Sequence, residues 1–108
     1  MHIEFRIQTT DTAEVLKGYI ERRLRFALGR FGDRVGHVTV RVSRNANEHE
    51  CRISTELMPF GRVAVQETDA DLFSAVDRAA GRVGRLFGRE LQRVRALRRS
   101  HESVRAAA

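Results

Sequence analysis

The sequence predicts an α+β fold in which one four-stranded sheet carries two helices on one face, in the chain order β-α-β-β-β-α. Several short segments alternate apolar and polar residues, as half-buried strands do, and two longer segments repeat apolar residues at helical spacing. Because each strand has one apolar face, both helices are expected to cover that same face. The 108 residues suffice for one domain with one hydrophobic core.

The first segments predict a strand followed by a helix. Residues 2–8 alternate, with isoleucine and phenylalanine on one side and mainly charged residues on the other. A helix is expected from about Thr12 to about Phe31, because apolar residues recur there every three or four positions. Asp11 is a suitable N-cap with an acid three residues later, and Gly32 is expected to end the helix.

Three strands are expected in the middle of the chain. Residues 37–43 alternate with valines inward, and residues 51–57 repeat the alternation after a polar hairpin loop over residues 44–50. Met58–Gly61 predicts a turn, because proline fits its second position and glycine its last. Residues 62–67 predict a short fourth strand.

A long helix is expected from about Asp69 to about Arg99, with Thr68 as its cap. Such a helix is longer than a domain of this size can cover, so its last turns should project. Residues 100–108 have no pattern and are expected to form a flexible tail. We therefore expect one domain over residues 1–99.

The net charge of +6 is concentrated at the C-terminal end. Residues 1–36 carry a net charge of about +2 and residues 37–71 about −2, whereas residues 72–108 hold nine basic and three acidic side chains. A basic balance favours a polyanionic partner, and a localised excess favours nucleic acid more strongly than a diffuse one.

The last predicted helix has an arginine stripe on the side opposite its apolar face. Five arginines share an arc of about 80° on a helical wheel, with no acid inside the arc. Like charges at this spacing repel, so we prefer a phosphate-binding role over an ordinary solvated face. The first helix adds further arginines. The candidate RNA-binding residues are Arg22, Arg23, Arg25, Arg30, Arg78, Arg82, Arg85, Arg89 and Arg93.

Three glycines share another side of the same helix, namely Gly81, Gly84 and Gly88. Glycine inside a helix costs about 1 kcal/mol relative to alanine, so the cluster needs a reason. The simplest is a close approach of the first helix, and the alternative is direct contact with a phosphate.

Residue patterns that carry catalysis or bind metal ions are missing from the sequence. The four histidines are far apart, the single Cys51 excludes a multi-cysteine zinc site, and no phosphate-loop or nucleophile-elbow motif is present. We expect no enzyme, no catalytic residue, no cofactor and no metal. Aromatic residues are few, which favours recognition of backbone and shape over base stacking. The longest stretch without a charged residue is about six residues, so we expect no membrane span. We expect the protein to be located in the cytoplasm.

Two segments resemble the ribosome hibernation promoting factor family, also described as ribosome-associated inhibitor or sigma-54 modulation proteins. Residues 71–77, Asp-Leu-Phe-Ser-Ala-Val-Asp, resemble the motif that opens that family's last helix, and residues 19–24, Tyr-Ile-Glu-Arg-Arg-Leu, are similar to its first helix. The likeness covers about residues 1–99 and is strongest to the short form. The family often has Lys or Arg at the positions of Phe26 and Gly29, where this chain has charge at Arg25 and Arg30.

The resemblance implies a ribosome-associated factor that binds the small ribosomal subunit through 16S-type rRNA. Family members occupy the mRNA and tRNA decoding channel, inhibit translation and keep idle ribosomes in hibernation. Their contacts lie on two basic helices, which implies Arg22 and Arg23 here, followed by Arg82, Arg85, Arg89 and Arg93.

Other interpretations stay open. Double-stranded RNA-binding domains also set two helices on an antiparallel sheet, and a regulatory protein that binds an acidic protein partner would fit the charge. A weak homodimer through the edge of the fourth strand is also compatible with the sequence, and whether ribosomes dimerise is left open. We expect no small-molecule substrate.

Overall fold

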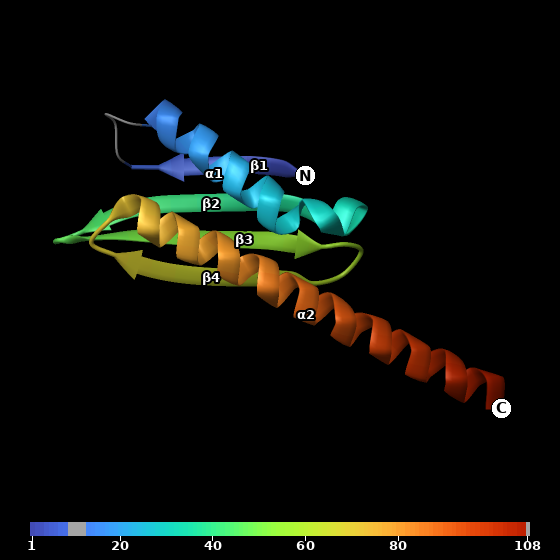
Figure 1. Ribbon diagram of the computed structural model, residues 1–108. Coiled ribbons are helices and arrows are strands. Elements are labelled where there is room, and N and C mark those ends of the chain that lie inside the picture. Colours follow the sequence, from blue (N-terminus) through green and yellow to red (C-terminus); the bar gives the residue numbers. More distant parts are fainter. Residues whose placement is uncertain (9–12, 108) are drawn as a thin grey trace.

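The computed structural model describes the backbone of residues 1–8 and 13–107, and the side chains of those residues up to 100. It confirms the α+β fold and the order of elements, and adds one short 3-10 helix, η1 (Figure 1). The elements are β1 (His2–Ile7), α1 (Ala13–Leu28), η1 (Gly29–Arg34), β2 (Val35–Asn45), β3 (Glu48–Leu57), β4 (Arg62–Asp69) and α2 (Leu72–Ala107).

The four strands form one mixed sheet in the order β1-β2-β3-β4. β1 is parallel to β2, and the other neighbours are antiparallel. A parallel pair needs a crossover connection, which α1 and η1 supply. β4 forms one edge of the sheet, as a homodimer through that edge would require, and the dimer itself stays a prediction.

The core lies between the sheet and the two helices, which cover the same face (Figure 1). Phe5, Val40, Ile53 and Val65 lie in register across the four strands and point to this face, where the latter three are buried. α1 contributes four fully buried residues, spaced as predicted at Leu16, Ile20, Leu24 and Leu28. α2 contributes the apolar residues Val76, Val83, Phe87 and Leu91.

Leu91 is the last buried residue of α2 in the described part of the chain. The helix has 36 residues, which corresponds to about 54 Å of a molecule whose longest extent is 61 Å. Its C-terminal turns therefore project beyond the sheet, as predicted (Figure 1).

The first helix ends earlier than predicted. α1 stops at Leu28, and the chain then tightens into η1, within which Gly32 has a φ of 56°. The tighter winding brings the Phe31 ring to 4.8 Å from the ring of Phe87, a tertiary contact that helical periodicity does not reveal. The predicted N-cap Asp11 lies outside the described residues.

The predicted loop over residues 44–50 is wrong. β2 continues to Asn45 and β3 begins at Glu48, so only Ala46 and Asn47 form the turn. Strand pairing uses backbone groups and does not require apolar side chains, and the polar residues extend the ladder past the core. β2 also begins at Val35 rather than at residue 37, because Val35 is buried in the core and pairs with Leu57 of β3 across a register irregularity.

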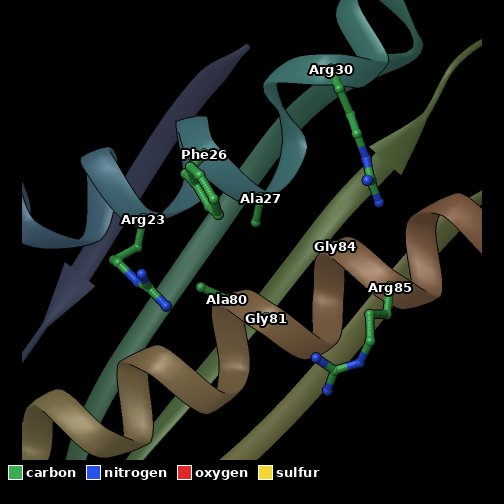
Figure 2. A pocket seen from close by; sticks show the side chains of 8 residues that line it. All are labelled: Arg23, Phe26, Ala27, Arg30, Ala80, Gly81, Gly84 and Arg85. Carbon is green, nitrogen blue, oxygen red and sulfur yellow. The ribbon is translucent and has the colours of Figure 1, made fainter.

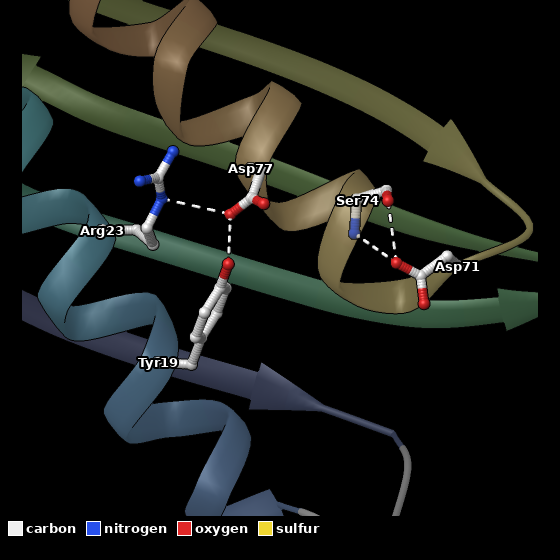
Figure 3. Close-up of polar contacts among 5 residues, drawn as sticks. All are labelled: Tyr19, Arg23, Asp71, Ser74 and Asp77. Atoms are coloured by element: carbon white, nitrogen blue, oxygen red, sulfur yellow. Dashed lines mark hydrogen bonds and ion pairs between the residues drawn. The ribbon is translucent and has the colours of Figure 1, made fainter.

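The N-terminus of the last helix differs from the prediction of Thr68 as cap. β4 continues to Asp69, and α2 begins at Leu72 with Asp71 as its cap. The backbone N–H and the hydroxyl of Ser74 donate to Asp71 Oδ2 at 3.0 and 2.8 Å (Figure 3).

The C-terminus of α2 also differs, because the helix continues past Arg99 to Ala107. The predicted unpatterned segment is therefore helical in its backbone up to residue 107. Arginine and alanine favour the helix even where no core covers it. A domain limit at residue 99 and a flexible tail stay predictions.

Cys51 lies in β3 with its side chain fully buried, and we expect it to be unreactive in the folded protein. Burial, with a smaller effect from the charge of Glu50, raises the pKa of the thiol to about 12, so almost no thiolate exists at neutral pH. A thiol reagent should label native protein only through unfolding, whereas protein in denaturant should react at once. Rapid labelling of the native protein at neutral pH would contradict this placement.

Candidate nucleic-acid interface

Two glycines of α2 allow it to approach α1 closely. A β-carbon at Gly84 would lie 2.9 Å from the backbone oxygen of Ala27, and one at Gly88 would lie 3.2 Å from the ring of Phe31. The interpretation of the glycine cluster as a close approach of the first helix is confirmed at Gly84, where the neighbour is α1 backbone; at Gly88 the neighbour is the Phe31 side chain of η1. A β-carbon at Gly81 would meet only the Arg85 guanidinium, at 3.4 Å. The two basic helices therefore form one continuous surface.

Ion pairs divide the arginine stripe of α2. Arg78 lies 3.2 Å from Asp69, and Arg82 lies 3.1 Å from Glu67. Both acids come from β4, so the arc, which contains no acid of α2 itself, is met by two acids of a neighbouring strand. The helical wheel describes α2 alone and cannot show a strand beside it.

Arg93 is paired within α2 itself. Its guanidinium lies 2.6 Å from Glu90 and donates to that carboxylate, and this hydrogen bonding lowers the pKa of Glu90. Arg85 and Arg89 are exposed, and no acid of the described residues pairs with either. The free positive charge of the stripe therefore centres on these two residues.

The candidate arginines of the first helix also separate into groups. Arg25 pairs with Glu21 at 2.8 Å, while Arg22 is exposed and meets no described acid. The Arg30 guanidinium lies over the Phe31 ring, 4.8 Å from its centroid. Arg23 belongs to the contact between the helices.

Asp77 of α2 holds α1 through two side chains (Figure 3). The Tyr19 hydroxyl donates to Asp77 Oδ1 at 2.5 Å, and Arg23 Nε lies 3.1 Å from the same oxygen. Arg23 Nε makes no well-aligned hydrogen bond there, so that contact is an ion pair. The two acids that bound the motif over residues 71–77 thus have structural tasks, since Asp71 caps α2 and Asp77 positions α1 on it.

Tyr19 allows this contact to be measured directly. The hydrogen bond to Asp77 comes first among the causes that raise the pKa of Tyr19 above its usual 10.0, followed by burial and the charge of Asp77. Because the folded-state pKa lies above the unfolded one, the associated stability is complete below pH 10 and is lost as the pH rises through the folded-state pKa. Asp77→Asn should move the pKa of Tyr19 back toward 10.

The chain contains one tyrosine and no tryptophan, so the ultraviolet absorbance of the phenolate reports Tyr19 alone. Wild-type protein should titrate at higher pH than Asp77→Asn. Asp69→Asn is a matched control. Asp69 accepts a hydrogen bond from the backbone N–H of Asp71 and pairs with Arg78, and neither contact involves Tyr19. Identical phenolate titrations for wild type and Asp77→Asn would contradict the contact.

A groove runs between the two helices (Figure 2). Its first part is a cavity of about 390 Å³ lined by Arg23, Phe26, Ala27, Arg30, Ala80, Gly81, Gly84 and Arg85. An adjoining cavity of about 400 Å³ shares Arg30 and is completed by Phe31, Gly88, Leu91, Gln92 and Arg95. Of the nine candidate arginines, the groove brings together Arg23, Arg30 and Arg85.

The sequence analysis missed two groove residues, Phe26 and Arg95. Phe26 is 84% exposed and lies at about 280° on the wheel of α1, well away from the apolar stripe near 50°. Arg95 lies at about 260° on the wheel of α2, outside the arginine arc but on the glycine side that faces α1. An aromatic residue off the apolar stripe, and an arginine in line with the glycines, are the signals that could have found them.

The face of the sheet away from the helices has a different character. It carries residues that alternate with the core positions, and its charges have both signs, as in Arg6 with Glu4 at 3.7 Å and Arg52 with Glu50 at 3.8 Å. Over the described ranges 1–8 and 13–107, we find no set of three potential metal-ligating side chains and no helix that is long and apolar enough to cross a membrane.

Comparisons with known proteins agree with this architecture. The family described as Sigma 54 modulation protein / S30EA ribosomal protein matches residues 3–95. The crystal structure of the Thermus thermophilus Protein Y N-terminal domain is 28% identical, with a TM-score of 0.72 over 82% of this chain and 98% of that chain. A ribosomal subunit interface protein from Coxiella burnetii is 18% identical and shares the fold, with a TM-score of 0.73 over 85% of this chain and 99% of that one. No curated protein matches.

The match over residues 3–95 spans most of the 108 residues, and it includes both segments on which the predicted resemblance rests. The resemblance inferred from the sequence is confirmed. The chain belongs to the Sigma 54 modulation protein / S30EA ribosomal protein family.

Proposed function

We propose that this protein binds the small ribosomal subunit through its 16S-type rRNA in the decoding channel, blocks the path of mRNA and tRNA, and holds ribosomes in hibernation. The observation that carries the proposal is the single basic surface formed by α1 and α2, on which Arg22, Arg85 and Arg89 are exposed and pair with no acid of the described residues. Arg30, Arg85 and Arg95 also line the groove between the helices. The similarity to a protein described as a ribosomal subunit interface protein and to Protein Y supports it.

The proposed mechanism is occlusion without catalysis. Arginine side chains contact phosphates, which positions the protein on the RNA and makes binding depend on salt. The molecule measures 61 × 23 × 18 Å, so it is narrow in two directions, as a ligand of a channel must be. Once seated, the protein would exclude other ligands from the space that it fills. The site of action would be the cytoplasm, where ribosomes translate.

Co-sedimentation of the full chain with purified small subunits tests the proposal. We expect binding at about 50 mM salt and release at about 300 mM, with a log-log salt slope of several if about five to eight phosphates are engaged. Purified large subunits are the control. Failure to sediment with small subunits at low salt would overturn the proposal.

The same preparation separates the other interpretations. Equally tight binding to any RNA duplex would indicate a general double-stranded RNA-binding module instead. A partner that stays bound after nuclease treatment would indicate an acidic protein. Sedimentation of the protein alone reports the weak homodimer, and the ribosome profile reports ribosome dimers.

A further inference from the structure

We propose that the groove between α1 and α2 is a binding site for one unpaired RNA nucleotide, whose base stacks on Phe26 while arginines hold the adjoining phosphates. This inference rests on the proposed function and specifies the kind of RNA element that the protein takes. It departs from the expectation of recognition by backbone and shape alone.

The first argument is the unusual exposure of Phe26. Its side chain is 84% exposed, although the four core leucine and isoleucine residues of the same helix are fully buried; Val15 is the other exposed large apolar residue of α1, at 67%. Figure 2 shows Phe26 at the groove, between Arg23 of α1 and Arg30 of η1 along the chain. An aromatic ring with a free face among cations suits a nucleobase, because every base offers a π-face for stacking.

The second argument is the size and floor of the cavity. Its volume of about 390 Å³ lies in the range of small-molecule sites. The floor consists of Ala27, Ala80, Gly81 and Gly84, which carry little or no side chain. A flat group can therefore lie over this floor, although it cannot pass between Ala27 and Gly84, where even a β-carbon has no room. A β-carbon at Gly81 would meet only the end of the flexible Arg85 side chain, so the backbone is open there.

The third argument is charge. Arg30 and Arg85 line the cavity, and neither pairs with an acid in the part of the chain that the structure describes. Arg23 also lines the cavity and forms an ion pair with Asp77, with 3.1 Å between Arg23 Nε and Asp77 Oδ1. The adjoining cavity adds Arg95. A phosphate backbone that follows the groove would meet these cations in succession, as single strands do in basic channels.

The ligand is an unpaired nucleotide rather than a duplex. Bases inside an A-form helix are stacked and paired, and an aromatic side chain reaches a base face only where the base is splayed out. The cavity of about 390 Å³ has the size of a small-molecule site, which suits one unpaired base, whereas a duplex has no free base to place in it.

Fluorescence anisotropy with a labelled oligouridylate of about eight nucleotides tests the site. Phe26→Ala should weaken binding about tenfold or more, which is the usual effect of losing one stacking partner. Phe60→Ala is the matched control, because Phe60 is 85% exposed and lies in the turn between β3 and β4, away from this groove. It should leave the affinity within about twofold.

An abasic strand of the same length separates stacking from charge, since it keeps the phosphates and lacks the bases. The proposal expects equal affinity of wild type and Phe26→Ala for this strand. Two results would overturn the proposal. One is that Phe26→Ala loses as much affinity for the abasic strand as for the oligouridylate. The other is that Phe26→Ala and Phe60→Ala bind the oligouridylate with equal affinity. Circular dichroism verifies that both variants are folded.

Small-subunit co-sedimentation of the same proteins distinguishes this failure from that of the proposed function. If wild type sediments with small subunits and Phe26→Ala behaves like Phe60→Ala on the oligouridylate, only the nucleotide site is wrong. If wild type does not sediment with small subunits, the proposed function itself is wrong.

Discussion

Gly84→Ala should lower the free energy of unfolding by about 1 kcal/mol, although alanine is the better helix former. The added β-carbon would lie 2.9 Å from the Ala27 backbone oxygen and 3.2 Å from the Ala27 β-carbon. Backbone cannot rotate away as a side chain can, so α1 and α2 must separate. The cost of overpacking, about 1–3 kcal/mol, exceeds the propensity gain of about 1 kcal/mol.

Gly81→Ala supplies the matched control one turn earlier on the same helix. Its β-carbon would meet only the end of the flexible Arg85 side chain, at 3.4 Å, so the propensity gain remains. It should raise the free energy of unfolding by about 0.5–1 kcal/mol. Urea denaturation monitored by circular dichroism measures both variants. Effects of the same sign would contradict the close contact seen at Gly84.

The double variant Arg85→Gln with Arg89→Gln should weaken small-subunit binding by about 30- to 100-fold at about 0.1 M salt and reduce the log-log salt slope by about 2. These two arginines are exposed, and no described acid competes with a phosphate for them. Glutamine has nearly the same helix propensity as arginine, so α2 should stay intact.

The charge-matched control also removes two positive charges, at Arg41 and Arg62, on the face of the sheet away from the helices. Both residues are exposed on strands, at positions that alternate with the core and point away from the helices. Arg41→Gln with Arg62→Gln should change binding by about threefold or less, because only the net charge changes. Equal losses for the two double variants would mean that net charge, and not the helix surface, governs binding. Sedimentation at several salt concentrations measures the difference.

The fold was largely predictable because each element carries its own periodicity. The valines at residues 38, 40 and 42 and the leucines of α1 are buried as their spacing indicates. The errors occurred where polar residues extend a regular element. Residues 44–45 and 48–50 form paired strand ends around a two-residue turn, and residues 100–107 continue α2, because backbone hydrogen bonding needs no apolar face.

The candidate interface was predictable only in part. A helical wheel shows where Arg78 and Arg82 point around α2, but not that Glu67 and Asp69 of β4 lie beside them. The groove arises from how the two helices sit against each other, which is a tertiary property. The wheel of α1 places Phe26 off the apolar stripe, but that it lines a groove became visible only in the structure. The roles of the candidate arginines in RNA binding stay predictions.

The two carboxylates of β4 act as built-in counterions. Over this edge of α2, a passing polyanion meets a weaker positive potential than the number of arginines suggests, since Arg78 and Arg82 are already neutralised. Non-specific binding to RNA becomes stronger as the number of unpaired basic side chains increases. If the protein binds RNA as proposed, the two acids of β4 would weaken binding to bulk cellular RNA, while Arg30 and Arg85 of the groove, which pair with no described acid, would keep their charge. Discrimination among polyanions would then depend on where the acids lie as much as on where the arginines do.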